Sequence, residues 1–257
     1  MFRKKKGLGK PSKFLFAAEA GRAAMEYGVY FASEPLLRFG KKGDGHPVLV
    51  IPGFMGGDMS TRPMRKFLER IGYDAYPWGA GRNKGGRKYV YAMVDLVNEI
   101  YEQRAEKVSV IGWSLGGVYA REVARRVPNK VRQVITMGSP FVGLNKKNNI
   151  SWVYKMITGE SVEDLDERMI EEMRQTPPVP VTAIYSKTDG IVPWKYCMEN
   201  PDSPNVQNIE VKGSHCGLGH NVTVLSCIAD RLSQEQASWQ PFKPSFFQRA
   251  FYPTYAI

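Results

Sequence analysis

The 257-residue chain is 43% hydrophobic and 24% charged, an ordinary composition for a globular protein large enough to bury a core without disulfide bonds. Its net charge of +11 favours anionic surfaces. No nucleic-acid-binding motif is present, however, and the basic residues are not interleaved with aromatic ones, so we expect no nucleic-acid partner. Only three cysteines occur, none in a C-x-x-C pair, which argues against a disulfide framework and favours a reducing, cytoplasmic compartment.

Residues 1–40 predict a basic N-terminal segment followed by a helix. The apolar stretch after the basic segment is interrupted by Glu19, Arg22 and Glu26, which argues against a secretory signal peptide and against a transmembrane helix. In a helix over residues 14–39 these three charges form one narrow polar stripe. The broad apolar face either lies in the headgroup region of an anionic membrane, as a peripheral contact, or packs on the body of the protein. The basic residues of the segment are Arg3, Lys4, Lys5, Lys6, Lys10 and Lys13.

Beyond residue 40 the sequence alternates between apolar runs of strand length and amphipathic stretches of helical length. Strands that alternate with helices build βαβ units, so residues 41–240 predict an α/β domain with a mostly parallel central sheet flanked by helices. The predicted strands are residues 47–51, 73–76, 107–111, 131–137, 181–185 and 206–211, and the predicted helices are residues 62–70, 88–104, 114–126 and 222–232.

Two segments depart from this alternation. Residues 141–178 contain two predicted short helices, 151–157 and 162–174, with no strand between them. We expect this insertion to form a small helical lid over the carboxyl ends of the strands. Residues 241–257 are rich in aromatic residues and proline and predict a C-terminal tail in extended conformation.

The segment Gly112-Trp113-Ser114-Leu115-Gly116 has the pattern G-x-S-x-G and lies between a predicted strand and a predicted helix. A serine in such a tight turn exposes its hydroxyl, and glycine is needed two residues away because a side chain there would be crowded. The helix that follows directs the positive end of its dipole at the turn. Ser114 is therefore the predicted nucleophile.

Over about residues 45–232 the sequence resembles the α/β-hydrolase superfamily, in particular its bacterial lipase and esterase branch. Besides the serine motif, the run Val-Ile-Pro-Gly-Phe at residues 50–54 resembles the superfamily's oxyanion loop, with Pro52 where histidine is common. The resemblance implies the backbone N–H groups of Phe54 and Leu115 as oxyanion donors, and a backbone donor survives the change at Pro52. It also implies an α/β-hydrolase fold, in which the insertion at residues 141–178 is the small helical lid expected above.

A serine hydroxyl needs a base, which is nearly always histidine, and the chain has three. His46 precedes the first predicted strand, at the edge of the sheet opposite the carboxyl ends where parallel sheets place their sites. His215 and His220 both follow the last predicted strand, where the superfamily places its base. Residues 213–218 resemble the H-x-G-L loop of small bacterial lipases, and His220 lies near a helix start whose dipole disfavours an imidazolium. We therefore favour His215 over His220.

The acid of the superfamily lies between the serine and the histidine in chain order. Asp189 stands in a turn directly after a predicted strand and is followed by apolar residues, which resembles the superfamily's acid loop. Asp202 is the alternative, but no predicted strand precedes it. In this arrangement Asp189 orients His215 and stabilises its charged form.

These residues predict hydrolysis of a carboxylic ester, as in a lipase or esterase, through an acyl-enzyme on Ser114 with His215 and Asp189 completing the triad. The expected substrate is a small-molecule or lipid ester, and no cofactor and no metal are expected, because no cluster of histidines and carboxylates is visible in the sequence. An acyltransferase or thioesterase would use the same triad, and a catalytically silent binding protein would keep the fold. All of these stay open as alternatives.

Overall fold

The computed structural model describes residues 11–37, 40–141, 174–236 and 238–255. Within these residues six strands form one sheet in the order β2-β1-β3-β4-β5-β6, and every neighbouring pair is parallel. The parallel sheet predicted from the alternation of strands and helices is therefore confirmed. The strands are β1 (Pro47–Ile51), β2 (Asp74–Tyr76), β3 (Val108–Trp113), β4 (Val131–Met137), β5 (Val181–Ser186) and β6 (Val206–Val211).

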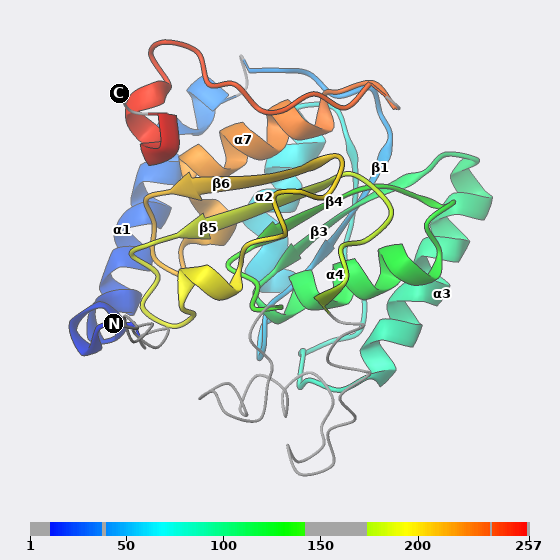
Figure 1. Cartoon of the computed structure of the whole chain (residues 1–257), viewed down its shortest axis with the longest axis horizontal. Helices are drawn as coiled ribbons and strands as arrows, with labels where there is room; N and C mark the ends of the chain where they lie inside the picture. Colours follow the sequence, from blue (N-terminus) through cyan, green and yellow to red (C-terminus); the bar gives the residue numbers. More distant parts are fainter. Residues whose placement is uncertain (1–10, 38–39, 142–173, 237, 256–257) are drawn as a thin grey trace, which may run out of the picture.

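Helices cover both faces of the sheet. On one face α3 packs beside α4, and on the other face α2 packs beside α7, with α1 packed on α7 (Figure 1). The α-helices are α1 (Lys13–Leu37), α2 (Asp58–Arg70), α3 (Lys88–Arg104), α4 (Leu115–Arg126) and α7 (Val222–Leu232), and the short 3-10 helices are η2 (Trp194–Tyr196), η3 (Leu218–His220), η4 (Arg249–Phe251) and η5 (Pro253–Tyr255).

Strand β1 shows why the strands read as continuous apolar runs. Successive side chains of a strand point to opposite faces, so Leu49 and Ile51 join the core beneath α3 and α4. Val48 and Val50 join the second core, beneath α2 and α7. Because both faces are covered, both sets of side chains are apolar and fully buried.

Two elements differ from the prediction. Helix α2 begins at Asp58 rather than at residue 62 and contains Pro63, whose missing N–H removes one hydrogen bond without ending the helix near its first turns. The C-terminal tail is not simply extended, because it contains the short helices η4 and η5. Its buried rings Phe242 and Tyr252 pack edge to face, with centroids 4.8 Å apart.

The two predicted lid helices fall on residues 142–173 and lie outside the described residues, apart from Arg174. The described chain enters this segment at Phe141, which follows β4 at the carboxyl edge of the sheet and is buried beneath the guanidinium of Arg121. Among the described helices, none is both long enough and apolar enough to cross a membrane.

Candidate active site

Ser114 occupies a strained turn between β3 and α4. Its backbone has φ 54° and ψ −122°, a left-handed conformation that is uncommon for residues other than glycine. A Cβ atom on Gly112 would overlap the backbone of the first turn of α4, and one on Gly116 would overlap the backbone at the end of β1. Two glycines thus let strand, turn and helix approach closely enough to present the Ser114 hydroxyl at the carboxyl edge of the sheet.

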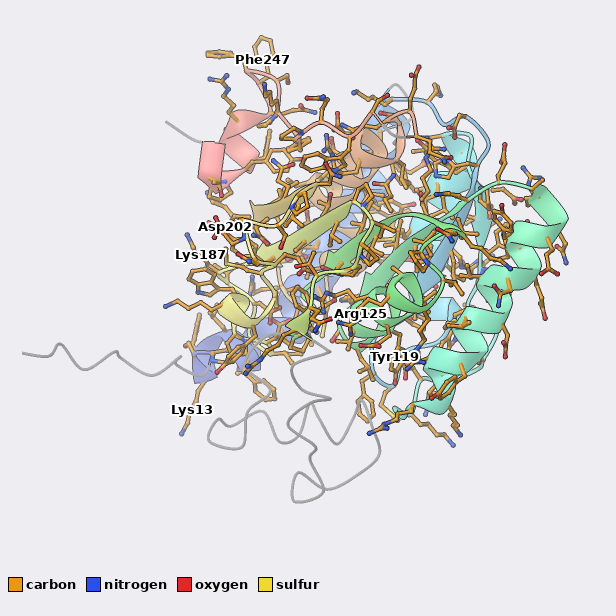
Figure 2. All side chains as sticks on the ribbon, turned by 45° about the vertical axis from the view of Figure 1, so that its right-hand side comes forward. Lys13, Tyr119, Arg125, Lys187, Asp202 and Phe247 are labelled. Atoms are coloured by element: carbon orange, nitrogen blue, oxygen red, sulfur yellow. The ribbon has the colours of Figure 1, made fainter. Side chains whose placement is uncertain are left out.

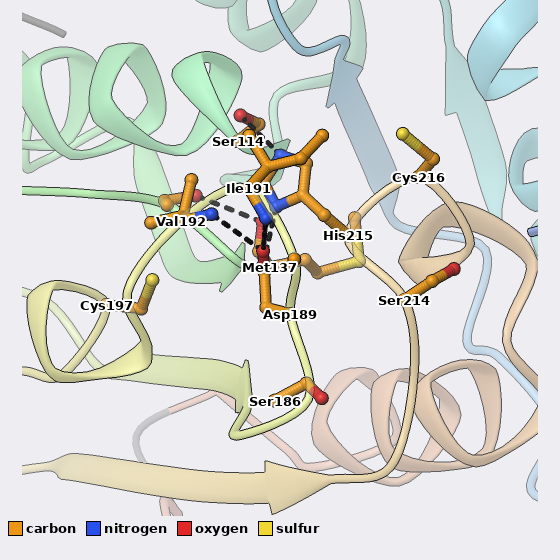
Figure 3. Close-up of polar contacts among 12 residues, drawn as sticks. Ser114, Met137, Ser186, Asp189, Ile191, Val192, Cys197, Ser214, His215 and Cys216 are labelled. Carbon is orange, nitrogen blue, oxygen red and sulfur yellow. Dashed lines mark hydrogen bonds and ion pairs between the residues drawn. The ribbon is translucent and has the colours of Figure 1, made fainter. Parts of the chain in front are cut away.

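His215 joins Ser114 to Asp189 by two hydrogen bonds. Its Nε2 lies 3.0 Å from the Ser114 Oγ, and its Nδ1 lies 2.6 Å from Oδ2 of Asp189. Figure 3 shows the three side chains in line, although they come from the loops after three different strands. The structure therefore brings together the three residues that the sequence singles out as nucleophile, base and acid.

The second oxygen of Asp189 is fixed by its own loop. Oδ1 accepts hydrogen bonds from the backbone N–H groups of Ile191 at 2.8 Å and Val192 at 2.7 Å (Figure 3). Asp189 and His215 are both buried, with 4% and 6% of their surfaces exposed. Both oxygens of the carboxylate thus have hydrogen-bond partners, so Asp189 can hold the imidazole in one orientation.

The loop after β1 lies directly against the serine. A Cβ atom on Gly53 would come within 3.1 Å of the Ser114 Cβ. Fully buried Asn83 holds this loop, because its side-chain Nδ2 donates to the Pro52 carbonyl at 2.9 Å and its backbone carbonyl accepts from the Met55 N–H at 2.7 Å. The sequence indicates a structural loop at residues 78–83 but not this role of Asn83, since the bond to Pro52 spans 31 positions.

The two predicted oxyanion donors are the N–H groups of Phe54, which follows Gly53, and of Leu115, which follows Ser114. Phe54 belongs to the loop held by Asn83, and its side chain is exposed. Leu115 is the first residue of α4, and the N–H of a first helical residue has no acceptor within its own helix. Leu115 is therefore adjacent to the serine in the chain, and Phe54 belongs to the loop whose Gly53 lies against it.

A carboxylate on α1 ties the acid loop to the histidine loop. Glu19 is 95% buried, and its Oε1 accepts hydrogen bonds from the N–H of Gly190 at 2.7 Å and of His215 at 3.1 Å. Its Oε2 accepts from the N–H of Cys216 at 3.0 Å. One side chain thus satisfies three loop amides, and hydrogen bonds to a charged acceptor are the stronger kind.

Two more polar side chains of α1 reach the same loops. Arg22 donates to the Thr188 carbonyl at 2.7 Å and to its hydroxyl at 3.1 Å, and Glu26 accepts from the Ser214 N–H at 2.7 Å. The polar stripe predicted for this helix therefore faces the protein body. The sequence predicted the polar stripe but left open which face of the helix contacts the protein body.

The remaining histidines and the alternative acid lie elsewhere. His46 is buried before β1 and bonds to Asp44 and Ser109. His220 Nε2 lies 3.0 Å from the Ala23 carbonyl on α1, and Asp202 is exposed in a surface turn (Figure 2). None of these three is drawn into the hydrogen-bonded chain that starts at Ser114.

Two neighbours of the histidine loop have structural contacts. The indole N–H of Trp113 donates to the His215 carbonyl at 3.0 Å. Burial, together with the nearby carboxylates of Glu19 and Asp189, raises the pKa of the Cys216 thiol to about 11, so this thiol stays protonated at neutral pH. In the described parts of the chain, no group of three or more His, Cys, Asp or Glu side chains could hold a metal ion.

Sequence comparisons match the region that carries these loops. The sequence model of the family described as palmitoyl protein thioesterase matches residues 47–189, more than half of the chain. A carboxylesterase of Bacillus subtilis (strain 168) is 25% identical over 151 residues, which are 53% of this chain and 60% of that protein. The chain thus matches less than two thirds of that relative's length.

Structure comparisons give α/β hydrolases. Lipase B of Aspergillus fumigatus matches with a TM-score of 0.59 and 17% identity, over 75% of this chain and 53% of that one. A monoacylglycerol lipase of Paleococcus ferrophilus matches with a TM-score of 0.53 and 17% identity, over 75% of this chain and 96% of that one. An α/β superfamily hydrolase of Oenococcus oeni PSU-1 matches with a TM-score of 0.53 and 14% identity, over 73% and 91%. At these identities the likeness concerns the fold alone, and it confirms the α/β-hydrolase fold predicted from the sequence.

Proposed function

Because the chain belongs to the palmitoyl protein thioesterase family of α/β hydrolases, we propose that it is a serine hydrolase that cleaves carboxylic esters through an acyl-enzyme. The observation that carries this proposal is the hydrogen-bonded chain from Ser114 through His215 to Asp189. It starts at the strained turn where a serine hydroxyl is held for attack. The fold makes a hydrolase the natural expectation, and the hydrogen-bonded chain supplies the groups for the chemistry.

The proposed reaction has two steps. In the first, the Ser114 Oγ forms a bond to the carbonyl carbon, its proton passes to His215 Nε2, and that proton then leaves with the alcohol as the ester bond breaks. In the second, His215 Nε2 takes a proton from water, whose oxygen bonds to the acyl carbon. The bond from that carbon to the Ser114 Oγ then breaks, His215 returns the proton to Oγ, and the acid leaves. Asp189 keeps Nε2 directed at the serine and stabilises the imidazolium in both steps.

The negative oxygen that develops on the carbonyl needs fixed donors. We assign this role to the N–H groups of Phe54 and Leu115. For Phe54, the support is that its loop lies against Ser114 and is held there by the hydrogen bonds of Asn83. For Leu115, the support is that its N–H lies at the start of α4, where the helix dipole also favours negative charge.

The substrate is a small-molecule or lipid ester in this proposal. The loop beside Ser114 exposes Phe54 and Met55, and the next helix exposes Met59, which gives the site an apolar rim suited to an acyl chain. Thioesters are the second candidate substrate class, because the family model that the chain matches is described by thioesterase activity. The triad serves both, since only the leaving atom differs.

The test of the proposal is labelling with a fluorophosphonate, whose phosphorus bonds to an activated serine Oγ as fluoride leaves. Peptide mass mapping should find the adduct on Ser114 in the wild-type chain and no adduct in Ser114→Ala. Ser109→Ala is the matched control and should label like the wild type. A folded wild-type chain that takes up no label would instead indicate a catalytically silent binding protein and would overturn the proposal.

Matched substrates separate the alternatives. An oxygen ester and a thioester that carry the same acyl chain should be compared by kcat/KM. A clear preference for the thioester would assign the family's described activity to this chain, and a preference for the oxygen ester supports the leading proposal. Product analysis with added alcohols or thiols detects an acyltransferase, because the acyl group then appears on the added acceptor rather than as free acid.

A further inference from the structure

Helix α1 places its charges on the inner side. Glu19, Arg22 and Glu26 bond to the loops that carry Asp189 and His215, at distances between 2.7 and 3.1 Å. An ordinary surface helix has the reverse arrangement, with apolar residues inward and charges in water.

The outward face of α1 is apolar instead. We define the outward face as the exposed residues of α1 from Lys13 to Ala32, and after Lys13 none of them carries a charge. The spaces between its large side chains hold only alanine and glycine. The large members are Phe14, Phe16, Met25, Tyr27, Val29 and Phe31, which are 78%, 65%, 72%, 40%, 55% and 61% exposed.

Contiguous exposed apolar surface of this kind marks a contact with a membrane or with another protein. The charge next to the outward face distinguishes a membrane from another protein. Residues 1–13, which end at the first residue of the outward face, hold six lysines and arginines, and no acidic residue occurs before Glu19. Lys13, the last of the six, extends away from the protein body at the start of α1 (Figure 2). A second copy of the chain carries the same cationic segment and so offers no complementary charge, whereas an anionic lipid surface attracts it.

We propose that the outward face of α1 docks in the headgroup region of an anionic lipid membrane. Basic residues would draw the protein to the surface, and the phenylalanine and methionine side chains would enter the boundary with the acyl chains. Docking follows from the apolar face of α1 and the basic residues that precede it, and it does not rest on the reaction assigned to Ser114.

The position of α1 gives docking a consequence for the site. The helix runs along the edge of the sheet at which β5 and β6 end (Figure 1), which is the edge that carries Asp189 and His215. Its backbone at Leu15 lies against Gly190, directly after Asp189. A protein docked through α1 would therefore hold its candidate active site close to the lipid surface.

The experiment is flotation of the full chain with vesicles of pure phosphatidylcholine and of equal parts phosphatidylcholine and phosphatidylserine. We expect binding to the mixed vesicles, weaker binding to the neutral ones, and a steep loss of binding as salt is raised, because salt screens the attraction. The test variant is Phe14→Gln/Met25→Gln/Phe31→Gln, which keeps good helix-forming residues on exposed positions. Each change should lower partitioning by about tenfold, given the transfer free energy of such a side chain.

The matched control is Tyr91→Gln, which removes an apolar side chain of α3 that is 54% exposed. It should bind vesicles like the wild type. Thermal unfolding of all variants checks that they are folded. The proposal fails if the wild type floats with neither vesicle, or if a folded triple variant binds as tightly as the wild type. It also fails if the wild type sediments as a dimer and the triple variant as a monomer, since a second copy would then cover the outward face.

Discussion

Two serine–histidine–aspartate sets with similar hydrogen-bond lengths stand at opposite ends of the same sheet. At the carboxyl edge, His215 bonds to Ser114 at 3.0 Å and to Asp189 at 2.6 Å. At the amino edge, His46 Nε2 bonds to the Ser109 hydroxyl at 2.8 Å and its Nδ1 to Asp44 at 2.5 Å. Side-chain distances alone do not tell the two sets apart.

The two sets differ in how accessible the serine is and in the backbone around it. Ser109 is fully buried within strand β3, where no substrate carbonyl can reach it. Ser114 is only partly buried, at a strained turn where a helix begins and beside a loop that can offer N–H donors. A hydrogen-bonded set therefore becomes a reactive site only where the fold also exposes the serine and offers hydrogen-bond donors to the negative oxygen of the intermediate.

The largest expected difference between the two sets concerns the serines. Ser114→Ala should lower ester hydrolysis by a factor on the order of 10⁴–10⁶, because triad members act as a unit. Ser109→Ala should leave the rate near that of the wild type and lower the free energy of unfolding by about 1–3 kcal/mol, since buried His46 loses a partner. Rates and urea unfolding curves of both variants check this. A fast Ser114→Ala enzyme would refute the assignment.

The acids provide the second comparison. Asp189→Asn should lower kcat about 10⁴-fold, because an amide can hold the wrong tautomer of the imidazole. Asp44→Asn should affect stability and leave kcat near the wild-type value. Steady-state kinetics with one ester substrate decides. Equal losses in the two variants would mean that the amino-edge set contributes to catalysis.

Residues near Ser114 show what the sequence could predict. The turn at Ser114 has a local pattern, in which two glycines at fixed spacing follow a strand and precede a helix, and the structure contains that turn. The loops of Asp189 and His215 follow from chain order in the superfamily. In each case the signal lies within a few consecutive residues.

Glu19 could not be predicted in this way. Its bond to the His215 N–H joins positions 196 residues apart, and no short pattern encodes such a contact. The polar stripe of α1 was visible in the sequence. Apolar faces usually turn inward, however, and here three loop amides that need an acceptor turn the charged side inward instead.

The third comparison concerns how each histidine loop is held. The N–H of His46 bonds to its own partner, Asp44, at 3.2 Å, whereas the N–H of His215 bonds to Glu19. Glu19 is thus a positioning residue for the carboxyl-edge set. Glu19→Ala should lower kcat by about 10- to 100-fold through misplacement of His215, with KM less affected, and should shift the pH profile of kcat.

A purely structural role for Glu19 would lower the amount of folded protein without moving that pH profile. Glu69→Ala is the matched control, since Glu69 is a surface carboxylate paired with Lys66. It should leave kcat and the profile unchanged. A folded Glu19→Ala variant with wild-type kcat and pH profile would show that the histidine loop holds its position without α1.

The smallest expected effect is a pH dependence of stability at the amino edge. Burial, aided by the nearby Arg132, lowers the pKa of His46. Burial alone would raise the pKa of Asp44, but hydrogen bonds from His46 outweigh it and lower that pKa to about 2, so Asp44 stays ionised above pH 5. As pH falls below about 6.5, His46 takes up a proton in the unfolded chain before it does so in the folded one. The free energy of unfolding must then fall, by at most about 1.4 kcal/mol per pH unit for one group.

His46→Gln removes this titration and keeps a side chain that can bond to Ser109. The wild type should therefore exceed His46→Gln in free energy of unfolding by the largest amount above pH 6.5. This difference should shrink steadily toward pH 5, because only the wild type loses the contribution of a neutral buried imidazole. Urea unfolding at half-unit pH steps measures it, and ester hydrolysis at pH 7 should be equal in the two proteins. A stability difference that stays constant from pH 8 to pH 5 would contradict the lowered pKa of His46. A loss of hydrolysis in folded His46→Gln would show that the two Ser–His–Asp sets are coupled, and that burial of Ser109 does not exclude its set from the reaction.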